Sequence, residues 1–164
     1  MGAPPAKKRC GCRILRMPRK HTTPVFLKGI VTPEAYERWL ERKAAAHVTR
    51  DRARGRTATR PLYKEAIHAA VVLSHGRDHY TGEPLEWNLI STYNNEKSKA
   101  GRHGYKSSFA LLPTVDHIDA GSIESSFRIC GWRTNDAKND LTPEQFVELC
   151  IKVVTFAGYS ILKH

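Results

Sequence analysis

Two short apolar runs, residues 109–115 and 127–132, most constrain what this chain can fold into. Each has the length and composition of a strand, and the polar residues 119–126 form a loop between them. The separation is that of a hairpin, so the runs predict a small antiparallel pair of strands. Pro113 interrupts the first run and lacks an N–H for a sheet ladder, which favours an edge position or a bulge.

The segments before this hairpin carry helix signals. Thr32 precedes Pro33 and Glu34, an arrangement that supplies an N-cap, a proline at the first helical position and an acid in the first turn. Residues 36–48 and residues 63–73 then repeat apolar side chains at helical spacing. We expect both stripes to pack on the remaining domain, because isolated helices of this size are marginally stable.

The segment after the hairpin predicts a further helix. Thr142, Pro143 and Gln145 form a capping box with proline at the first helical position. The apolar residues that follow at helical spacing are expected to pack in the core: Phe146, Leu149, Cys150, Val153, Val154 and Ala157. The whole pattern predicts an α+β fold that is mainly helical and contains one small antiparallel hairpin.

The 164 residues carry a formal net charge of +11, and the excess lies in the first third. Residues 1–60 hold 16 Lys or Arg against 4 Asp or Glu, a net +12, whereas residues 61–164 hold 11 against 12, a net −1. This asymmetry predicts a polyanionic partner contacted by the N-terminal part. A basic face that only increases solubility is the alternative.

Composition also suggests how the chain is organised. Residues 1–24 contain four prolines and seven Lys or Arg, as in a basic flexible tail, and residues 25–60 are expected to form a basic helical extension. The main domain would then span residues 61–164. No apolar run approaches the ~20 residues needed to cross a bilayer, and no signal-peptide pattern opens the chain, so we expect a cytoplasmic protein.

Four arginines occur within seven residues, and their guanidinium groups are always charged and can bind phosphate bidentately. They are Arg50, Arg52, Arg54 and Arg56. We expect them to contact DNA, with a solvated basic loop as the alternative.

The four cysteines do not form a disulfide framework in a chain of this length. Cys10 and Cys12 supply at most half of a metal site, because no second pair follows at suitable spacing. Cys130 and Cys150 lie in apolar patterns and are expected to be buried thiols.

Side chains suited to phosphodiester chemistry flank the second strand. Asp116 and His117 follow the first apolar run, and Asn135 follows the second. Hard divalent cations prefer oxygen ligands such as Asp and Asn, and a neutral imidazole can accept a proton from water. The pattern favours a metal-dependent enzyme that cuts nucleic acid. The alternatives are Asp119 as the carboxylate, or a hydrogen-bonded Asp-His turn with no metal.

The order of strand, loop, strand and helix resembles the ββα-metal unit of the HNH endonuclease family. The matching segments are residues 115–118, 127–132 and 135–138, and residues 80–85 resemble the hairpin that often precedes this unit. On this resemblance the domain at residues 61–164 would be an HNH-like nuclease domain. The first helix is similar to the basic helix of small uncharacterised HNH-type proteins of phages and proteobacteria.

The resemblance implies a single-metal site acting on double-stranded DNA. His117 would be the general base, and Asp116 and Asn135 would hold one Mg²⁺ or Mn²⁺ ion. Asn139 lies four residues beyond Asn135, on the same helical face, and is a candidate third ligand or a partner of the ligands.

Two cations are candidates for holding the phosphate. They are Lys138 and Arg133, and Lys138 could equally belong to a structural ion pair.

Two departures from the family pattern matter. Many members carry two Cys-x-x-Cys pairs that bind zinc, but Gly131 and Thr134 stand at one pair of these positions and no cysteine lies near Tyr80. We therefore expect no structural zinc, with apolar packing holding the hairpin and the last helix instead. The family's middle Asn falls near Ser126, which predicts a less ordered loop and reduced activity.

A rival hypothesis is a non-catalytic basic DNA-binding protein in which the ββα unit is only a scaffold. RNA binding or cleavage ranks third, because the stacking aromatic pattern of single-strand readers is not evident.

Overall fold

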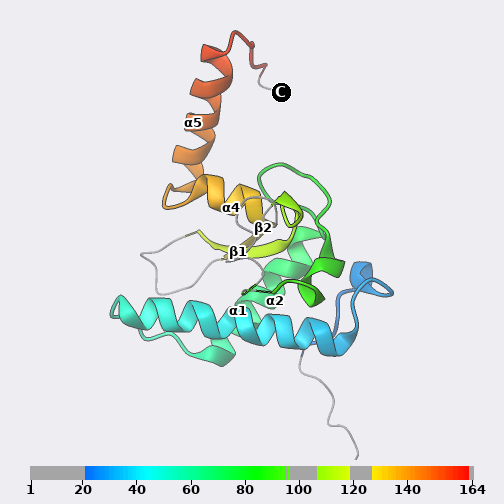
Figure 1. Ribbon diagram of the computed structural model, residues 1–164. Coiled ribbons are helices and arrows are strands. Elements are labelled where there is room, and N and C mark those ends of the chain that lie inside the picture. Colours follow the sequence, from blue (N-terminus) through cyan, green and yellow to red (C-terminus); the bar gives the residue numbers. More distant parts are fainter. Residues whose placement is uncertain (1–20, 95, 97–106, 119–126, 163–164) are drawn as a thin grey trace, which may run out of the picture.

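A computed structural model describes residues 21–94, 96, 107–118 and 127–162 and gives an α+β fold (Figure 1). Within these residues, four α-helices accompany one two-stranded antiparallel hairpin. The elements in chain order are η1 (Val25–Leu27), α1 (Pro33–Ala53), α2 (Arg60–Ser74), η2 (Trp87–Ser91), β1 (Pro113–His117), β2 (Phe127–Gly131), α4 (Trp132–Lys138) and α5 (Pro143–Phe156).

The predicted helix starts are confirmed. Thr32 Oγ1 accepts a hydrogen bond from the Ala35 N–H at 3.2 Å, which caps α1. At the start of α5 the capping box is complete, because Thr142 Oγ1 accepts from the Gln145 N–H while Gln145 Oε1 accepts from the Thr142 N–H. Both caps satisfy amide groups that have no partner inside the helix.

The hairpin is shorter than predicted. β1 begins only at Pro113, because the residues before it form a turn in which the Leu112 N–H bonds to the Phe109 carbonyl at 3.0 Å. β1 pairs with β2 from Pro113 opposite Gly131 to His117 opposite Phe127. A proline at the first residue of a strand costs no ladder hydrogen bond.

β2 ends at Gly131, and α4 starts at the next residue. Asn135 is therefore the fourth residue of α4 and does not open the helix. A Cβ atom at position 131 would stand 3.1 Å from the Ala110 carbonyl oxygen and 3.2 Å from Asp78 Oδ2, so the close packing here favours glycine.

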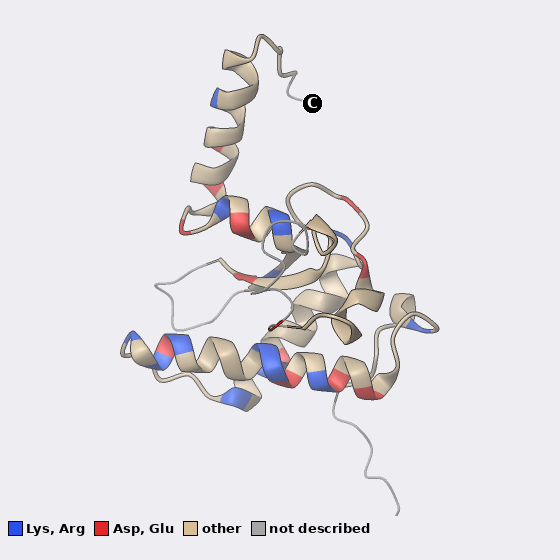
Figure 2. Cartoon of the chain, viewed as in Figure 1, with Lys and Arg blue, Asp and Glu red and all other residues tan. Residues whose placement is uncertain are grey.

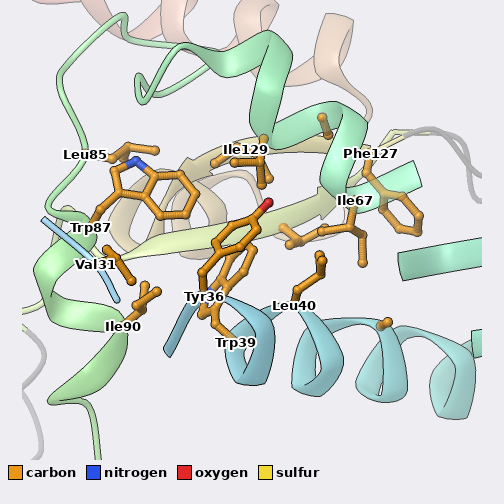
Figure 3. Packing of buried hydrophobic residues seen from close by; sticks show 14 of the residues in the cluster. Val31, Tyr36, Trp39, Leu40, Ile67, Leu85, Trp87, Ile90, Phe127 and Ile129 are labelled. Carbon is orange, nitrogen blue, oxygen red and sulfur yellow. The ribbon is translucent and has the colours of Figure 1, made fainter. Parts of the chain in front are cut away.

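One hydrophobic core joins the N-terminal helices to the hairpin. Tyr36, Trp39 and Leu40 of α1 pack with Ile67 of α2 and Ile129 of β2 (Figure 3). α2 lies against β2, and α4 lies against both strands. The segment predicted as a basic extension, residues 25–60, thus contributes to the same core as the segment predicted as the main domain.

A buried carboxylate fastens the turn that follows α2. Asp78 Oδ1 accepts from the N–H groups of Tyr80 and Thr81, at 2.8 and 3.1 Å, and Oδ2 accepts from the Gly131 N–H at 2.7 Å. The side chain is only 2% exposed. Asp78 therefore ties the turn at residues 77–84 directly to the end of β2, where apolar packing was expected to do so.

The expectation that α5 packs in the core is wrong. Its first turn contacts the body through buried Pro143 and through Phe146, whose ring centroid lies 5.6 Å from that of Tyr80. The rest of α5 projects away from the other elements (Figure 1), and the predicted stripe is exposed, including Cys150. Among the described helices, none has both the length and the apolar character needed to cross a membrane.

Candidate active site

A cleft of about 690 Å³ opens where the end of α1, the end of β1 and the region of α4 meet. Its lining includes the predicted residues Asp116, His117, Asn135, Lys138 and Asn139, and also Arg50 and Arg54 from α1. Side chains separated by up to 89 positions in the sequence therefore face one hollow.

Asp116 is buried in β1, and both of its carboxylate oxygens are engaged. Oδ1 lies 3.2 Å from the Lys138 Nζ, an ion pair in which both side chains are nearly inaccessible. Oδ2 accepts a hydrogen bond from the Tyr80 hydroxyl at 2.5 Å. Burial and this contact raise the pKa of Tyr80, so its hydroxyl remains a donor. Lys138 is thus a structural ion-pair member that also lines the cleft.

The two asparagines reach the cleft from different backbone positions. Asn135 lies within α4, but Asn139 follows its last residue and has φ +49°, outside the helical region. The two residues therefore do not share a helical face, which corrects the geometric reason for pairing them. Asn139 still lines the cleft, as do the residues 140–142 that follow it.

His117, the last residue of β1, stacks on Phe127 with ring centroids 4.9 Å apart. Its Nδ1 lies 3.7 Å from Asp51 Oδ2, and no hydrogen-bond partner for its buried Nε2 lies among the described residues. Burial lowers the pKa of His117, while Asp51 acts in the opposite direction. A neutral imidazole can accept a proton, but Nε2 is buried here and would do so only where water reaches it.

Asp51 was not anticipated from the sequence. It lies in the last turn of α1, is 1% exposed, accepts a hydrogen bond from the Tyr63 hydroxyl and is 3.3 Å from the Arg56 guanidinium. In the sequence Asp51 stands between Arg50 and Arg52, and an acid in such a position suggests only an ion pair on the surface. Its Oδ2 lies 3.7 Å from His117 Nδ1, which makes this carboxylate a candidate for orienting the ring.

His47 packs behind the general-base candidate. Its ring contacts those of His117 and Phe127, and the Arg50 guanidinium lies 3.1 Å from its ring nitrogens. Burial, with Arg50 as the next cause, lowers the pKa of His47 to about 3. His47 is therefore neutral at physiological pH, and its uncharged ring packs beside His117.

The four clustered arginines make different contacts in the structure. Arg50 and Arg54 are four residues apart, share one side of α1 and line the cleft. Arg52 points elsewhere, with Nε 3.4 Å from the Ala58 carbonyl oxygen, and Arg56 pairs with Asp51. Arg133 lies outside the cleft lining, and its guanidinium forms an exposed ion pair with Glu83.

A second basic cleft, about 560 Å³, lies at the other end of β1, where Leu112 and Pro113 form part of its wall. Its cations come from α1 and are Arg38, Arg42 and Lys43. Burial and the neighbouring arginines lower the pKa of Lys43 to about 8. Figure 2 shows Lys and Arg distributed along α1, which connects the two clefts.

The residues around Asp116 fit a hard cation in their chemistry. Asn135 and Asn139 line the hollow with Asp116, and the acids Asp136 and Asp140 line it too. Both Asp116 oxygens are already engaged by Lys138 and Tyr80, so a cation bound to Asp116 would have to share or displace these contacts. Among the described residues, no group of three His, Cys, Asp or Glu side chains gathers as a metal cluster. A cation here would thus depend on amide oxygens and water. Asp119, Ser126, Cys10 and Cys12 lie outside the described residues.

No protein-family model, curated protein or solved structure matches the chain.

Proposed function

We propose that this chain is a metal-dependent endonuclease of the HNH type that hydrolyses phosphodiester bonds in double-stranded DNA. The observation that carries the proposal is the cleft itself: Asp116 and Asn135 line the same hollow as His117, with arginines at its edge. Phosphoryl hydrolysis needs these parts, namely oxygen ligands for a cation, a base for water and positive charge for the phosphate.

His117 acts as the general base in this proposal. The Asp51 carboxylate near Nδ1 favours the tautomer that carries its proton on that nitrogen, which leaves the lone pair on Nε2. Nε2 is buried in the described structure, so taking a proton from water requires that DNA binding or a side-chain movement opens a path to this nitrogen. After the transfer, the same carboxylate stabilises the imidazolium that forms. Phe127 stacks against the ring and limits its rotation.

Asp116, Asn135 and Asn139 would hold one Mg²⁺ or Mn²⁺ ion. When bound, this ion supplies Lewis-acid stabilisation of charge on the phosphate and on the leaving oxygen. Lys138 balances the buried Asp116 carboxylate and remains beside the phosphate position as a second positive charge. Tyr80 orients the other oxygen of that carboxylate.

The DNA backbone follows α1 from one basic cleft to the other. Arg38 lies in α1 and Arg54, 16 residues further on, is the residue that caps its C-terminal end, and at 1.5 Å per residue this spans about 24 Å. With phosphates spaced ~3.4 Å along each strand, that length covers about seven nucleotides. Positive charge along such a path supports the alternative as well, a basic DNA-binding protein without catalysis.

A plasmid assay separates cleavage from binding. We expect the full chain to nick or linearise plasmid with Mg²⁺ or Mn²⁺, and EDTA to stop the reaction. His117→Ala should lose ~10²–10⁴-fold in rate, because a positioned base is removed, while its gel-shift affinity stays near wild type.

His79→Ala is the matched control, because His79 is an exposed histidine outside the cleft lining, and it should cleave normally. Band shifts without cleavage in either metal would favour the non-catalytic alternative. Wild-type cleavage by His117→Ala would overturn the assignment of the base.

A further inference from the structure

The exposed surface of α5 is unlike that of the other helices. Val153 is 60% exposed and Phe156 is 97% exposed, and Val147, Leu149 and Ile151 are also open to solvent. The chain beyond the helix continues this surface with Tyr159 and Leu162. Isolated apolar side chains on a surface are ordinary, but a contiguous apolar surface of this size marks an interface.

The polar residues of α5 occupy one narrow side. Glu148, Lys152 and Thr155 recur at helical spacing. The Lys152 Nζ lies 2.7 Å from Glu148 Oε1, and this ion pair is exposed to solvent. The remaining arc is apolar and more than half the circumference. Its members are Phe146, Val147, Leu149, Cys150, Ile151, Val153, Val154, Phe156 and Ala157. Such a helix requires a partner for its apolar arc.

We propose that α5 pairs in antiparallel orientation with α5 of a second copy of this chain. The available area supports this occupant. With aromatic side chains contributing ~150–250 Å² each, the exposed apolar residues of 147–162 offer on the order of 800–1,000 Å² per copy. A standard stable interface buries ~800 Å² per partner. A two-fold pair uses the same patch on both copies.

Charge also favours a second copy of α5. α5 has two acids and one base, Glu144, Glu148 and Lys152, and is drawn almost entirely in tan in Figure 2. A charged partner such as nucleic acid finds little to bind there, whereas two nearly neutral helices pack without repulsion. Antiparallel pairing places the two basic bodies at opposite ends of the 14-residue helix, about 21 Å of axis apart.

The centre of the pair follows from the length of the helix. In two fully overlapping antiparallel copies of Pro143–Phe156, residues near position 150 lie opposite one another. Cys150 is exposed and lies in the middle of the apolar arc, so the two Cys150 thiols would be neighbours. Its small side chain permits the helices to approach closely.

Sedimentation of the full chain without DNA tests the pairing, so the result is independent of any nuclease activity. We expect a monomer–dimer equilibrium in the micromolar range. Val153→Glu and Phe156→Glu should each raise the dissociation constant at least tenfold. Thr155→Glu adds the same charge on the polar side and should leave it unchanged. The proposal would be overturned if the wild type is monomeric, whether or not it binds lipid vesicles. It would also be overturned if all three substitutions raise the dissociation constant equally.

Thiol crosslinking tests whether Cys150 lies at the centre of the pair. In a Cys10→Ser, Cys12→Ser background, mild oxidation should produce a covalent dimer through Cys150, and adding Cys150→Ser should abolish it. Cys130 is not expected to react, because it is buried and burial raises its pKa to about 12. A dimer in sedimentation that forms no crosslink would overturn the antiparallel arrangement centred on Cys150.

Discussion

Asp51 Oδ2 in α1 lies 3.7 Å from His117 Nδ1 at the end of β1. This relationship links the N-terminal helix to the proposed chemistry, because the carboxylate faces the ring nitrogen that does not accept the proton from water. Asp51 touches neither water nor phosphate in our proposal and is a positioning residue.

Asp51→Asn should lower the maximal cleavage rate about 10–10²-fold while DNA affinity stays unchanged. The pKa of His117 is already lowered by burial, and Asp51 opposes that shift, so removing its charge lowers the pKa further. The acid limb of the pH–rate profile, where the base becomes protonated, should therefore move to lower pH. A rate and acid limb both equal to wild type would show that Asp51 only stabilises the fold.

The Asp116–Lys138 pair predicts a non-additive mutant cycle. Asp116→Leu leaves the Lys138 ammonium buried without its carboxylate, which should cost about 3–5 kcal/mol of unfolding free energy. Lys138→Met should also destabilise, but Asp116→Leu with Lys138→Met should recover much of the loss and remain inactive. Urea unfolding of the single and double variants measures the coupling. Strictly additive losses would contradict a direct interaction.

His47 predicts a loss of stability in acid. Its pKa is lowered to about 3 in the folded state, against ~6.5 in the unfolded chain. The unfolded state therefore binds more protons between these values, and stability falls as the pH drops from about 6.5 towards 3. His47→Gln should flatten this slope when urea midpoints are compared at several pH values. An identical pH dependence in both proteins would refute the buried, neutral histidine.

Arg50 and Arg54 should differ from Arg52 in DNA binding. The first two line the cleft, whereas Arg52 contacts the Ala58 carbonyl. Changing either of the first two to Gln should weaken binding and reduce the slope of log affinity against log salt by about one unit. Arg52→Gln removes the same charge and serves as the control, with a smaller change. Equal effects at all three positions would indicate only a diffuse basic surface.

Local sequence signals predicted much of the secondary structure. The caps at Thr32 and Thr142 depend on neighbouring residues, and both are confirmed. The hairpin was also foreseen, since its two strands are close in sequence. The exposure of the apolar arc of α5 could not be predicted. Periodicity shows that a helix has an apolar face, but it does not show what covers that face.

The residues supporting the cleft were less predictable. Asp116 and His117 could be recognised because they are adjacent and match a motif. Asp51 and Tyr80 reach them from 66 and 36 positions away, and no local pattern marks such long-range contacts. Their positions follow from the packing of α1 and of the turn after α2 on the hairpin.

Asp78 gives the turn after α2 an anchor made of amide hydrogen bonds. A turn held by a zinc ion on cysteine thiolates loses its structure when a chelator removes the ion. The Asp78 carboxylate accepts three backbone N–H hydrogen bonds and needs no ion, so EDTA should leave this turn intact. If EDTA abolishes cleavage and added Mg²⁺ restores it, the loss can then be assigned to the catalytic ion and not to unfolding of this turn.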